Sequence, residues 1–362
     1  MKMFSEHFFV FALCCSHVIC VLQHVSLSGY PDAVCSDGTP AAYYRSPRDK
    51  DDAHAPDNYV IFLEGGGYCH DVNACDWRCQ MAPHLCTTPE SETIQNSGIL
   101  SDDAGINPYF HGYFKVDLPY CTSDMYVGRR FGSELTKGHH FQGHRVLTAM
   151  IQSLIADVRI DKAKRILFGG SSAGGAGVAF NCDYMKSLLP RSRIHCIVDA
   201  AFFYPETHPF SEDEPCESID KVLAVGGVLW DSPEVSGFHL DGWWGDVRQD
   251  LLIGIARFDQ FGLESFCHNE TSERDLDTWG AAIGQIARDL RWRYPRVGLF
   301  MPGCIGHMML NDDAAFGGLP VGERRLTYSD TAWNWVNGSR DIHVMDTCHD
   351  DQSGCQKYCR VN

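Results

Sequence analysis

The sequence has few basic residues for its length and no apolar stretch that crosses a membrane comfortably. Its 30 Lys and Arg residues are outnumbered by 47 Asp and Glu residues, which leaves a formal charge of −17 at pH 7. A charge of that sign repels phosphate backbones and anionic membrane surfaces at long range, so we expect no nucleic-acid partner. It also weighs against a densely acidic polysaccharide, such as strongly demethylated pectin, as a substrate.

Tandem repeats, low-complexity tracts and long structureless linkers are also absent from the sequence. Nothing therefore divides the chain, and 362 residues of which 44% are hydrophobic suffice to bury one large core. We expect a single α/β domain over residues 30–362.

The apolar run near the N-terminus, Phe8–Leu22, is broken by two polar residues and is too short for a comfortable membrane span. With Lys2 before it, the run is typical of a secretory signal peptide. We assign residues 1–29 to this leader, with cleavage between Ser16 and Gly29. The alternative is an uncleaved signal anchor. After cleavage we expect a secreted protein without stable membrane insertion, which could reach a cell wall.

The cysteines favour disulfide bonds. Three of the 17 lie in the leader, which leaves 14, an even number. Even parity and two glycosylation sequons, at Asn269 and Asn337, suit an oxidising compartment and allow up to seven disulfides. The alternative is a zinc site at Cys75 and Cys79, but the thiols are spread along the chain rather than grouped as a tetrahedral set. We expect no metal.

Short apolar runs that end at glycine or polar residues mark the expected strands. They are Tyr59–Leu63, Arg165–Phe168, His195–Val198, Leu251–Ala256 and Val297–Met301. Between the first two, apolar residues recur at helical spacing from Val146 to Val158. This alternation predicts a mostly parallel sheet with helices on both faces, whose chemistry lies beyond the carboxyl ends of the strands.

The segment Gly170–Gly174 matches the motif G-x-S-x-G. It follows a short apolar strand and precedes a small-residue helix beginning near Ala173, which is the context of this motif in α/β-hydrolase-like folds. The glycines permit a tight turn that projects the Ser172 hydroxyl off the sheet. Ser171 is in the wrong frame, because Ala173 stands where its second glycine is needed. The alternative, a phosphate-binding turn, lacks the usual Gly-Lys-Ser/Thr.

A serine nucleophile needs a base, usually a histidine that a carboxylate orients. In this architecture both residues follow the nucleophile in the sequence. Asp259 lies just past an apolar run, and His307 follows the next one in a glycine-containing loop. We therefore predict a triad of Ser172, Asp259 and His307. The alternatives for the acid and the base are Asp199, His343 and His349.

Three glycines, Gly65–Gly67, follow the first expected strand. They resemble the H-G-G-G type of loop, in which backbone N–H groups face a carbonyl oxygen because no side chain blocks the approach. The helix start after Ser172 offers a further N–H. We expect Gly66, Gly67 and Ala173 to bind the oxyanion, and the alternative is an ordinary glycine turn.

Together these motifs resemble the pectin acetylesterase and Notum family of secreted α/β-hydrolases. Five segments recur in that family in the same order: Cys35–Tyr44, Phe62–Cys69, Asn107–Tyr109, Pro119–Asp124 and Gly170–Gly175. The family's triad carries over onto Ser172, Asp259 and His307. The resemblance also implies the disulfides Cys69–Cys75 and Cys35–Cys121. It assigns no pocket residue between Glu206 and Arg248.

The resemblance implies a serine carboxylesterase that forms an acyl-enzyme on Ser172 without a metal or organic cofactor. Notum-like members carry a tryptophan where this chain has Gly67, which favours O-acetyl esters of pectin or another cell-wall polysaccharide as substrate. Ser171, in contrast, matches the Notum-like form. One alternative is therefore a Notum-like deacylase that removes a fatty acyl group from a secreted protein. Another is a catalytically silent extracellular binding protein on a hydrolase scaffold.

Overall fold

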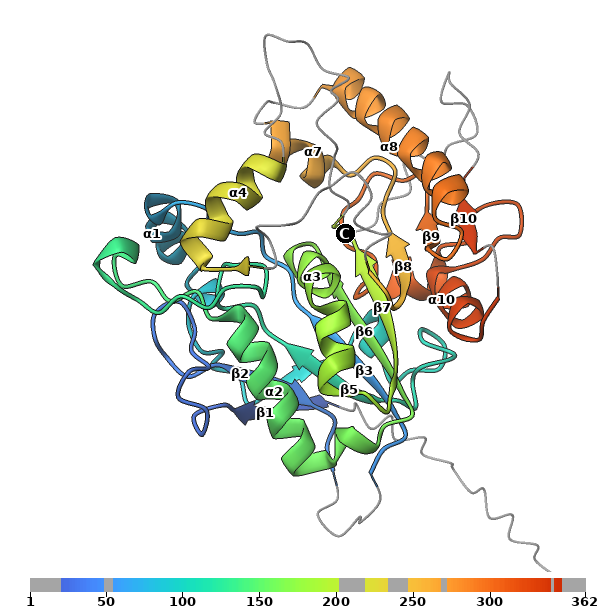
Figure 1. The fold of residues 1–362 in the computed structure, drawn as a ribbon. Coiled ribbons are helices and arrows are strands. Elements are labelled where there is room, and N and C mark those ends of the chain that lie inside the picture. Colours follow the sequence, from blue (N-terminus) through green and yellow to red (C-terminus); the bar gives the residue numbers. More distant parts are fainter. Residues whose placement is uncertain are drawn as a thin grey trace, which may run out of the picture.

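The computed structural model describes residues 21–48, 55–201, 219–233, 247–267, 272–339 and 342–346. Its centre is a sheet of ten described strands in the order β10-β9-β8-β7-β6-β3-β5-β2-β1-β4 (Figure 1). The strands are β1 (Val21–Ser26), β2 (Ala42–Arg45), β3 (Asn58–Leu63), β4 (Thr93–Gln95), β5 (Phe114–Leu118), β6 (Arg165–Ser171), β7 (Arg193–Asp199), β8 (Asp250–Gly254), β9 (Gly298–Met301) and β10 (His343–Met345).

The strands from β10 to β5 in this order are parallel, whereas β2, β1 and β4 pair antiparallel at one edge. This arrangement confirms the predicted α/β fold with a mostly parallel sheet. All five predicted strands are present, as β3, β6, β7, β8 and β9, and the predicted helix is part of α2 (Gly143–Val158).

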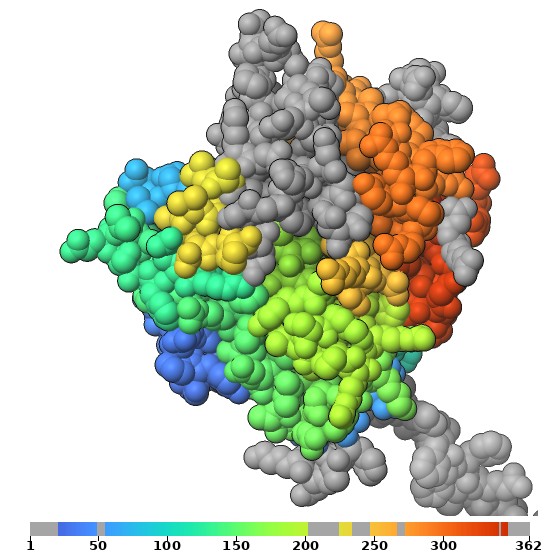
Figure 2. Space-filling view, in the orientation of Figure 1, coloured from blue at the N-terminus to red at the C-terminus, as the bar shows by residue number. Residues whose placement is uncertain are grey.

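Both faces of the parallel strands are buried, because successive side chains along a strand point to opposite faces. Ile61 belongs to a core with α2, α3 (Ala173–Leu188) and α8 (Glu273–Arg293). Phe62 belongs to a second core with α9 (Asp313–Gly318) and α10 (Tyr328–Val336). Figure 2 shows one outer face, where α2, α3 and α8 cover the sheet. Helices therefore pack on both faces, as the sequence predicts.

The sheet begins inside the segment that the sequence assigns to the leader. Strand β1 pairs with both β2 and β4, and Leu22 is fully buried. Only Val21 and Leu22 of this strand belong to the apolar run of the leader, and the strand lies within the interval in which the sequence predicts cleavage. We propose that any cleaved leader ends before Val21. No helix within the described ranges is long and apolar enough to cross a membrane.

Four disulfides link described cysteines. Cys35–Cys121 and Cys69–Cys75 are the pairs that the resemblance implied, and Cys79–Cys86 and Cys182–Cys196 are additional. Because Cys75 and Cys79 each form a disulfide, neither thiolate is available to a zinc ion. Of the two sequon asparagines, Asn337 is exposed at the end of α10, whereas Asn269 lies outside the described residues.

The start of α3 packs directly against the end of β3. A Cβ atom on Gly174 would lie 2.0 Å from the carbonyl oxygen of Leu63, and one on Gly170 would lie 2.5 Å from the carbonyl oxygen of Gly174. Both obstacles are backbone atoms, which cannot rotate away. The two glycines of the predicted motif are therefore required by packing.

We expect Gly174→Ala to lower the free energy of unfolding by about 2 kcal/mol or more, because α3 must move off β3. At an unobstructed helical site the same change stabilises by about 0.5–1 kcal/mol. Denaturant unfolding followed by circular dichroism measures the difference. The control is Gly112→Ala, where a Cβ meets nothing within 4 Å. Equal stability of both variants would show that the contact is not a constraint.

Candidate active site

Ser172 occupies the sharp turn between β6 and α3. Its backbone has φ 55° and ψ −124°, a conformation that residues with a side chain rarely adopt. The Ser172 N–H donates to the Asp199 carbonyl (2.9 Å), and the Ser172 carbonyl accepts from the Ala176 N–H (3.0 Å). Ser172 itself is half-buried, so its side chain can be reached at the carboxyl edge of the sheet.

Ser171 is not available as a nucleophile. It is fully buried, and its hydroxyl donates to Asp199 Oδ2 at 2.7 Å. This contact agrees with the alignment of the G-x-S-x-G motif on Gly170–Gly174, which places the reactive hydroxyl at Ser172.

The loops after β8 and β9 bring Asp259 and His307 together. A parallel bridge joins Phe258 to Ile305, so the two loops leave the sheet side by side. His307 Nδ1 lies 2.8 Å from Asp259 Oδ2 and 3.0 Å from Oδ1. Asp259 is buried and also accepts from the Gly262 N–H at 2.8 Å. Because a carboxylate can only accept, Nδ1 carries the proton and Nε2 is left as the basic nitrogen.

His307 Nε2 is buried and has no hydrogen-bond partner among the described residues. Gly65 lies between Ser172 and Met308, the residue after His307. A Cβ atom on Gly65 would be 2.9 Å from Ser172 Cβ and 3.4 Å from Met308 Sδ. The described contacts include no Ser172–His307 hydrogen bond, and such bonds often tighten only when substrate binds.

Two carboxylates set the charge of His307. Burial alone would lower its pKa, but the attraction and hydrogen bond of Asp259, with a further attraction from Asp199, outweigh burial and raise the pKa above 6.5. At a given pH, the imidazolium form of His307 is therefore more populated than that of a free histidine. A general base of a serine nucleophile must carry a proton during the reaction, and the two carboxylates stabilise that charged form.

Asp199 does not occupy the position of the triad acid. Its Oδ2 accepts from the Ser171 hydroxyl and from the N–H groups of Met309 (2.9 Å) and Leu310 (3.1 Å). Burial raises its pKa to about 6. Asp199 therefore ties the turn at Ser172 to the loop of His307. Of the alternative bases, His343 lies on the edge strand β10, and His349 lies outside the described residues.

The glycine loop runs past the nucleophile. Gly66 and Gly67 have φ values of 143° and 70°, which favour glycine, and a Cβ on Gly66 would lie 2.7 Å from Leu85 Cδ2. Among the described residues, the N–H groups of Gly66 and Gly67 donate to no protein acceptor. Ala173 is the first residue of α3, where the N–H has no acceptor within the helix. All three N–H groups are therefore available to a bound oxygen.

Sequence reasoning missed one residue of this region, Arg78 in α1 (Val72–Met81). Its guanidinium donates to the Gly66 carbonyl and, at 2.8 Å, to the Ser123 hydroxyl. The only sequence signal is an arginine between two closely spaced cysteines.

A cavity of about 520 Å³ lies at the opposite edge of the sheet. It is lined by Arg165 and Arg193, which begin β6 and β7, and by the buried His195. Ser172 follows the carboxyl end of β6, so this cavity is too remote to hold an acyl group bound to it.

The profile of the family described as Pectinacetylesterase matches residues 17–234. The chain is 34% identical over 222 residues to the palmitoleoyl-protein carboxylesterase NOTUM of Schmidtea mediterranea, covering 58% of this chain and 41% of that protein. It is 33% identical over 305 residues to notum1' of Xenopus laevis (76% and 60%) and 31% identical over 177 residues to pectin acetylesterase 11 of Arabidopsis thaliana (47% and 43%).

The chain thus spans between 41% and 60% of the length of these curated relatives. Among solved structures, one described as the Wnt deacylase Notum from Drosophila superposes with a TM-score of 0.79 at 21% identity, covering 93% of this chain and 100% of that chain. At that level of identity, the superposition shows a shared fold.

We expect Asp259→Asn to lower the pKa of His307, because the carboxylate that favours the imidazolium is removed. Ring signals of the histidines, followed by NMR as the pH changes, measure this directly. The control is His195, whose pKa burial lowers to about 4 and which should not respond. An unchanged His307 would show that Asp259 does not set its charge.

Proposed function

Because the chain belongs to the pectin acetylesterase and Notum family, we propose that it is a serine carboxylesterase that hydrolyses O-acetyl esters of pectin or another cell-wall polysaccharide. The observation that carries this proposal is the Asp259–His307 hydrogen bond, which leaves Nε2 as a base in the loop after β9, while Ser172 occupies a strained turn at the same edge of the sheet. Such a constellation is the chemical requirement for acyl transfer, and a silent binding protein has no need of it.

In the proposed reaction, Ser172 Oγ attacks the acyl carbonyl while its proton moves to His307 Nε2. Asp259 holds the imidazole and stabilises its positive charge. The N–H groups of Gly66, Gly67 and Ala173 bind the oxyanion of the tetrahedral intermediate. The alcohol leaves with the proton from His307. Water, deprotonated by His307, then cleaves the acyl-enzyme and releases the acid together with free Ser172.

We further propose that the protein acts outside the cell. The four disulfides among described cysteines require an oxidising compartment for their formation. An N-terminal leader and sequons at Asn269 and Asn337 fit the same route.

Gly67 supports an acetyl substrate. It adds no side chain to the wall of the site, whereas a long acyl chain gains affinity only where apolar groups enclose it along its length. The competing proposal, removal of a fatty acyl group from a protein, is favoured by the names of most of the curated relatives and by Ser171. In both cases the chemistry at Ser172 is the same.

We expect Ser172→Ala to lower kcat for p-nitrophenyl acetate by about 10³-fold or more, since the members of a triad act as a unit. Ser171→Ala removes one hydrogen bond to Asp199 and should cost only about tenfold. Thermal unfolding of both variants checks that the fold is intact. Equal losses in the two variants would mean that Ser172 is not the nucleophile.

We also expect kcat/KM to fall steeply from acetate through butyrate to octanoate and palmitate esters of p-nitrophenol, because a shallow acyl site encloses only a short chain. Release of acetate from acetylated pectin and xylan should accompany this profile. The Ser172→Ala variant supplies the background rate. A profile that rises to eight carbons or more would instead support the fatty-acyl deacylase.

A further inference from the structure

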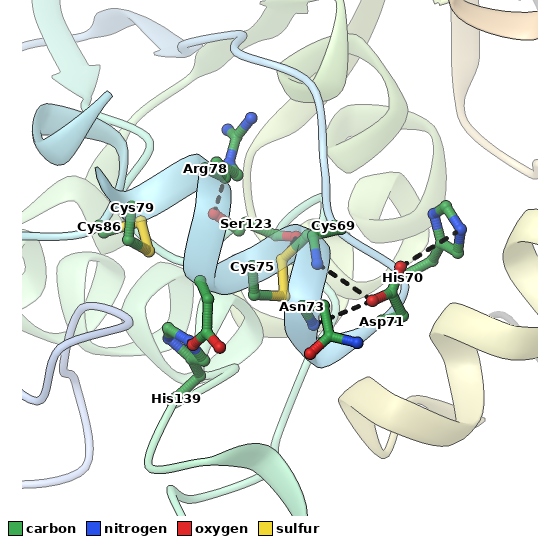
Figure 3. The surroundings of a disulfide bond; sticks show 12 residues. Cys69, His70, Asp71, Asn73, Cys75, Arg78, Cys79, Cys86, Ser123 and His139 are labelled. Carbon is green, nitrogen blue, oxygen red and sulfur yellow. Dashed lines mark hydrogen bonds and ion pairs between the residues drawn. A yellow bond between two sulfur atoms is a disulfide. The ribbon is translucent and has the colours of Figure 1, made fainter. Parts of the chain in front are cut away.

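Helix α1 is fastened at both ends beside the glycine loop. Cys69–Cys75 joins the end of that loop to the helix, and Cys79–Cys86 closes its other end, with sequence separations of 6 and 7 residues (Figure 3). The Asp71 side chain caps the helix by accepting from the N–H groups of Asn73 (2.9 Å) and Ala74 (3.0 Å). A short helix held in this way is a rigid support for the side chain of Arg78.

The guanidinium of Arg78 donates a hydrogen bond to the backbone of the glycine loop. Nη2 donates to the Gly66 carbonyl. Nε donates to Ser123 Oγ (Figure 3), at a distance of 2.8 Å. The guanidinium carbon lies 5.8 Å from the centre of the Tyr120 ring. Ser123 also accepts the Cys69 N–H through its carbonyl, at 3.1 Å. Arg78 and the backbone of Cys69, at the end of the loop, thus both bind Ser123.

The charge of Arg78 is not neutralised locally, since no carboxylate in the described part of the chain forms an ion pair with it. Burial lowers its pKa, but a guanidinium keeps its proton at any physiological pH. A partly buried positive charge therefore lies against the loop where negative charge develops in the proposed reaction.

The carbonyl that Arg78 binds belongs to the same peptide unit as the Gly67 N–H. A donor on the carbonyl oxygen fixes the plane of the peptide, and it also polarises the N–H into a stronger donor. Two adjacent glycines have the greatest backbone freedom, so this peptide would otherwise turn easily. We propose that Arg78 is a positioning residue that orients and polarises the Gly66–Gly67 peptide for oxyanion binding. This inference rests on the proposed esterase function.

The test compares Arg78→Met, which removes the charge and both donors, with Arg78→Lys, which keeps the charge. We expect Arg78→Met to lower kcat for p-nitrophenyl acetate by about 10²-fold while KM changes less than about threefold, as for loss of one oxyanion donor. Arg78→Lys should recover part of kcat. The pH midpoint of kcat/KM should stay at its native value, because His307 is not touched.

The matched control is Lys137→Met. It removes the exposed ion pair that Lys137 forms with Asp76 of α1, and it should leave kcat unchanged. If Arg78→Met does not fold, Ser123→Ala, which removes one Arg78 partner, takes its place with an expected severalfold loss of kcat. Native kcat in either Arg78→Met or Ser123→Ala would overturn the inference. The inference would also be overturned if the variant were so unstable that the smaller fraction of folded enzyme accounted for the whole loss of kcat.

A crystal structure of Arg78→Met separates this inference from the proposed function. A rotated Gly66–Gly67 peptide supports the positioning role even if the native protein hydrolyses none of the esters, in which case only the proposed function fails. An unchanged peptide in a stable variant overturns the inference while leaving the esterase proposal intact.

Discussion

The closeness of α3 to the end of β3 is the constraint on which the carboxyl edge of the sheet depends. No side chain fits between Gly174 and the Leu63 carbonyl, so α3 can begin only after a sharp turn, and that turn forces Ser172 into its strained backbone conformation. The glycine loop leaves the same end of β3 and passes directly over Ser172. One packing contact therefore sets both the direction of the nucleophile and the position of the N–H groups beside it.

Buried carboxylates help to hold the surrounding loops in place. Asp199 accepts from the turn at Ser171 and from two N–H groups after His307, and Asp124 accepts from the N–H groups of Gly143 and Tyr126. Burial raises the pKa of each of these two aspartates to about 6. Such acceptors fix backbone direction, because each oxygen is satisfied by particular N–H groups. An acidic composition thus serves the interior as well as the surface.

The sequence predicts the parallel half of the sheet because its strands are continuous apolar runs that end at glycine or polar residues. It does not predict β5, where the buried Lys115 and Asp117 interrupt the apolar pattern, nor β1, which begins in the apolar run that the sequence assigns to a leader. Asp259 and His307 could be paired from the sequence alone, because they follow two successive apolar runs after the nucleophile. Arg78 could not be found in this way, because its role depends on a contact with a backbone carbonyl that no residue pattern encodes.

The sequence separation of the paired cysteines sets the order in which the disulfides can form during biosynthesis. The two bridges around α1 each join cysteines 6 or 7 residues apart, so they can close as soon as that segment enters an oxidising lumen. The Cys35–Cys121 bridge spans 86 residues and requires the chain through β5. Until Cys121 has been synthesised, Cys35 remains a free thiol. The four cysteines that enter the lumen in the meantime could pair with it wrongly. Recombinant production will consequently depend on a host with disulfide isomerase, and a reducing bacterial cytoplasm is a poor choice.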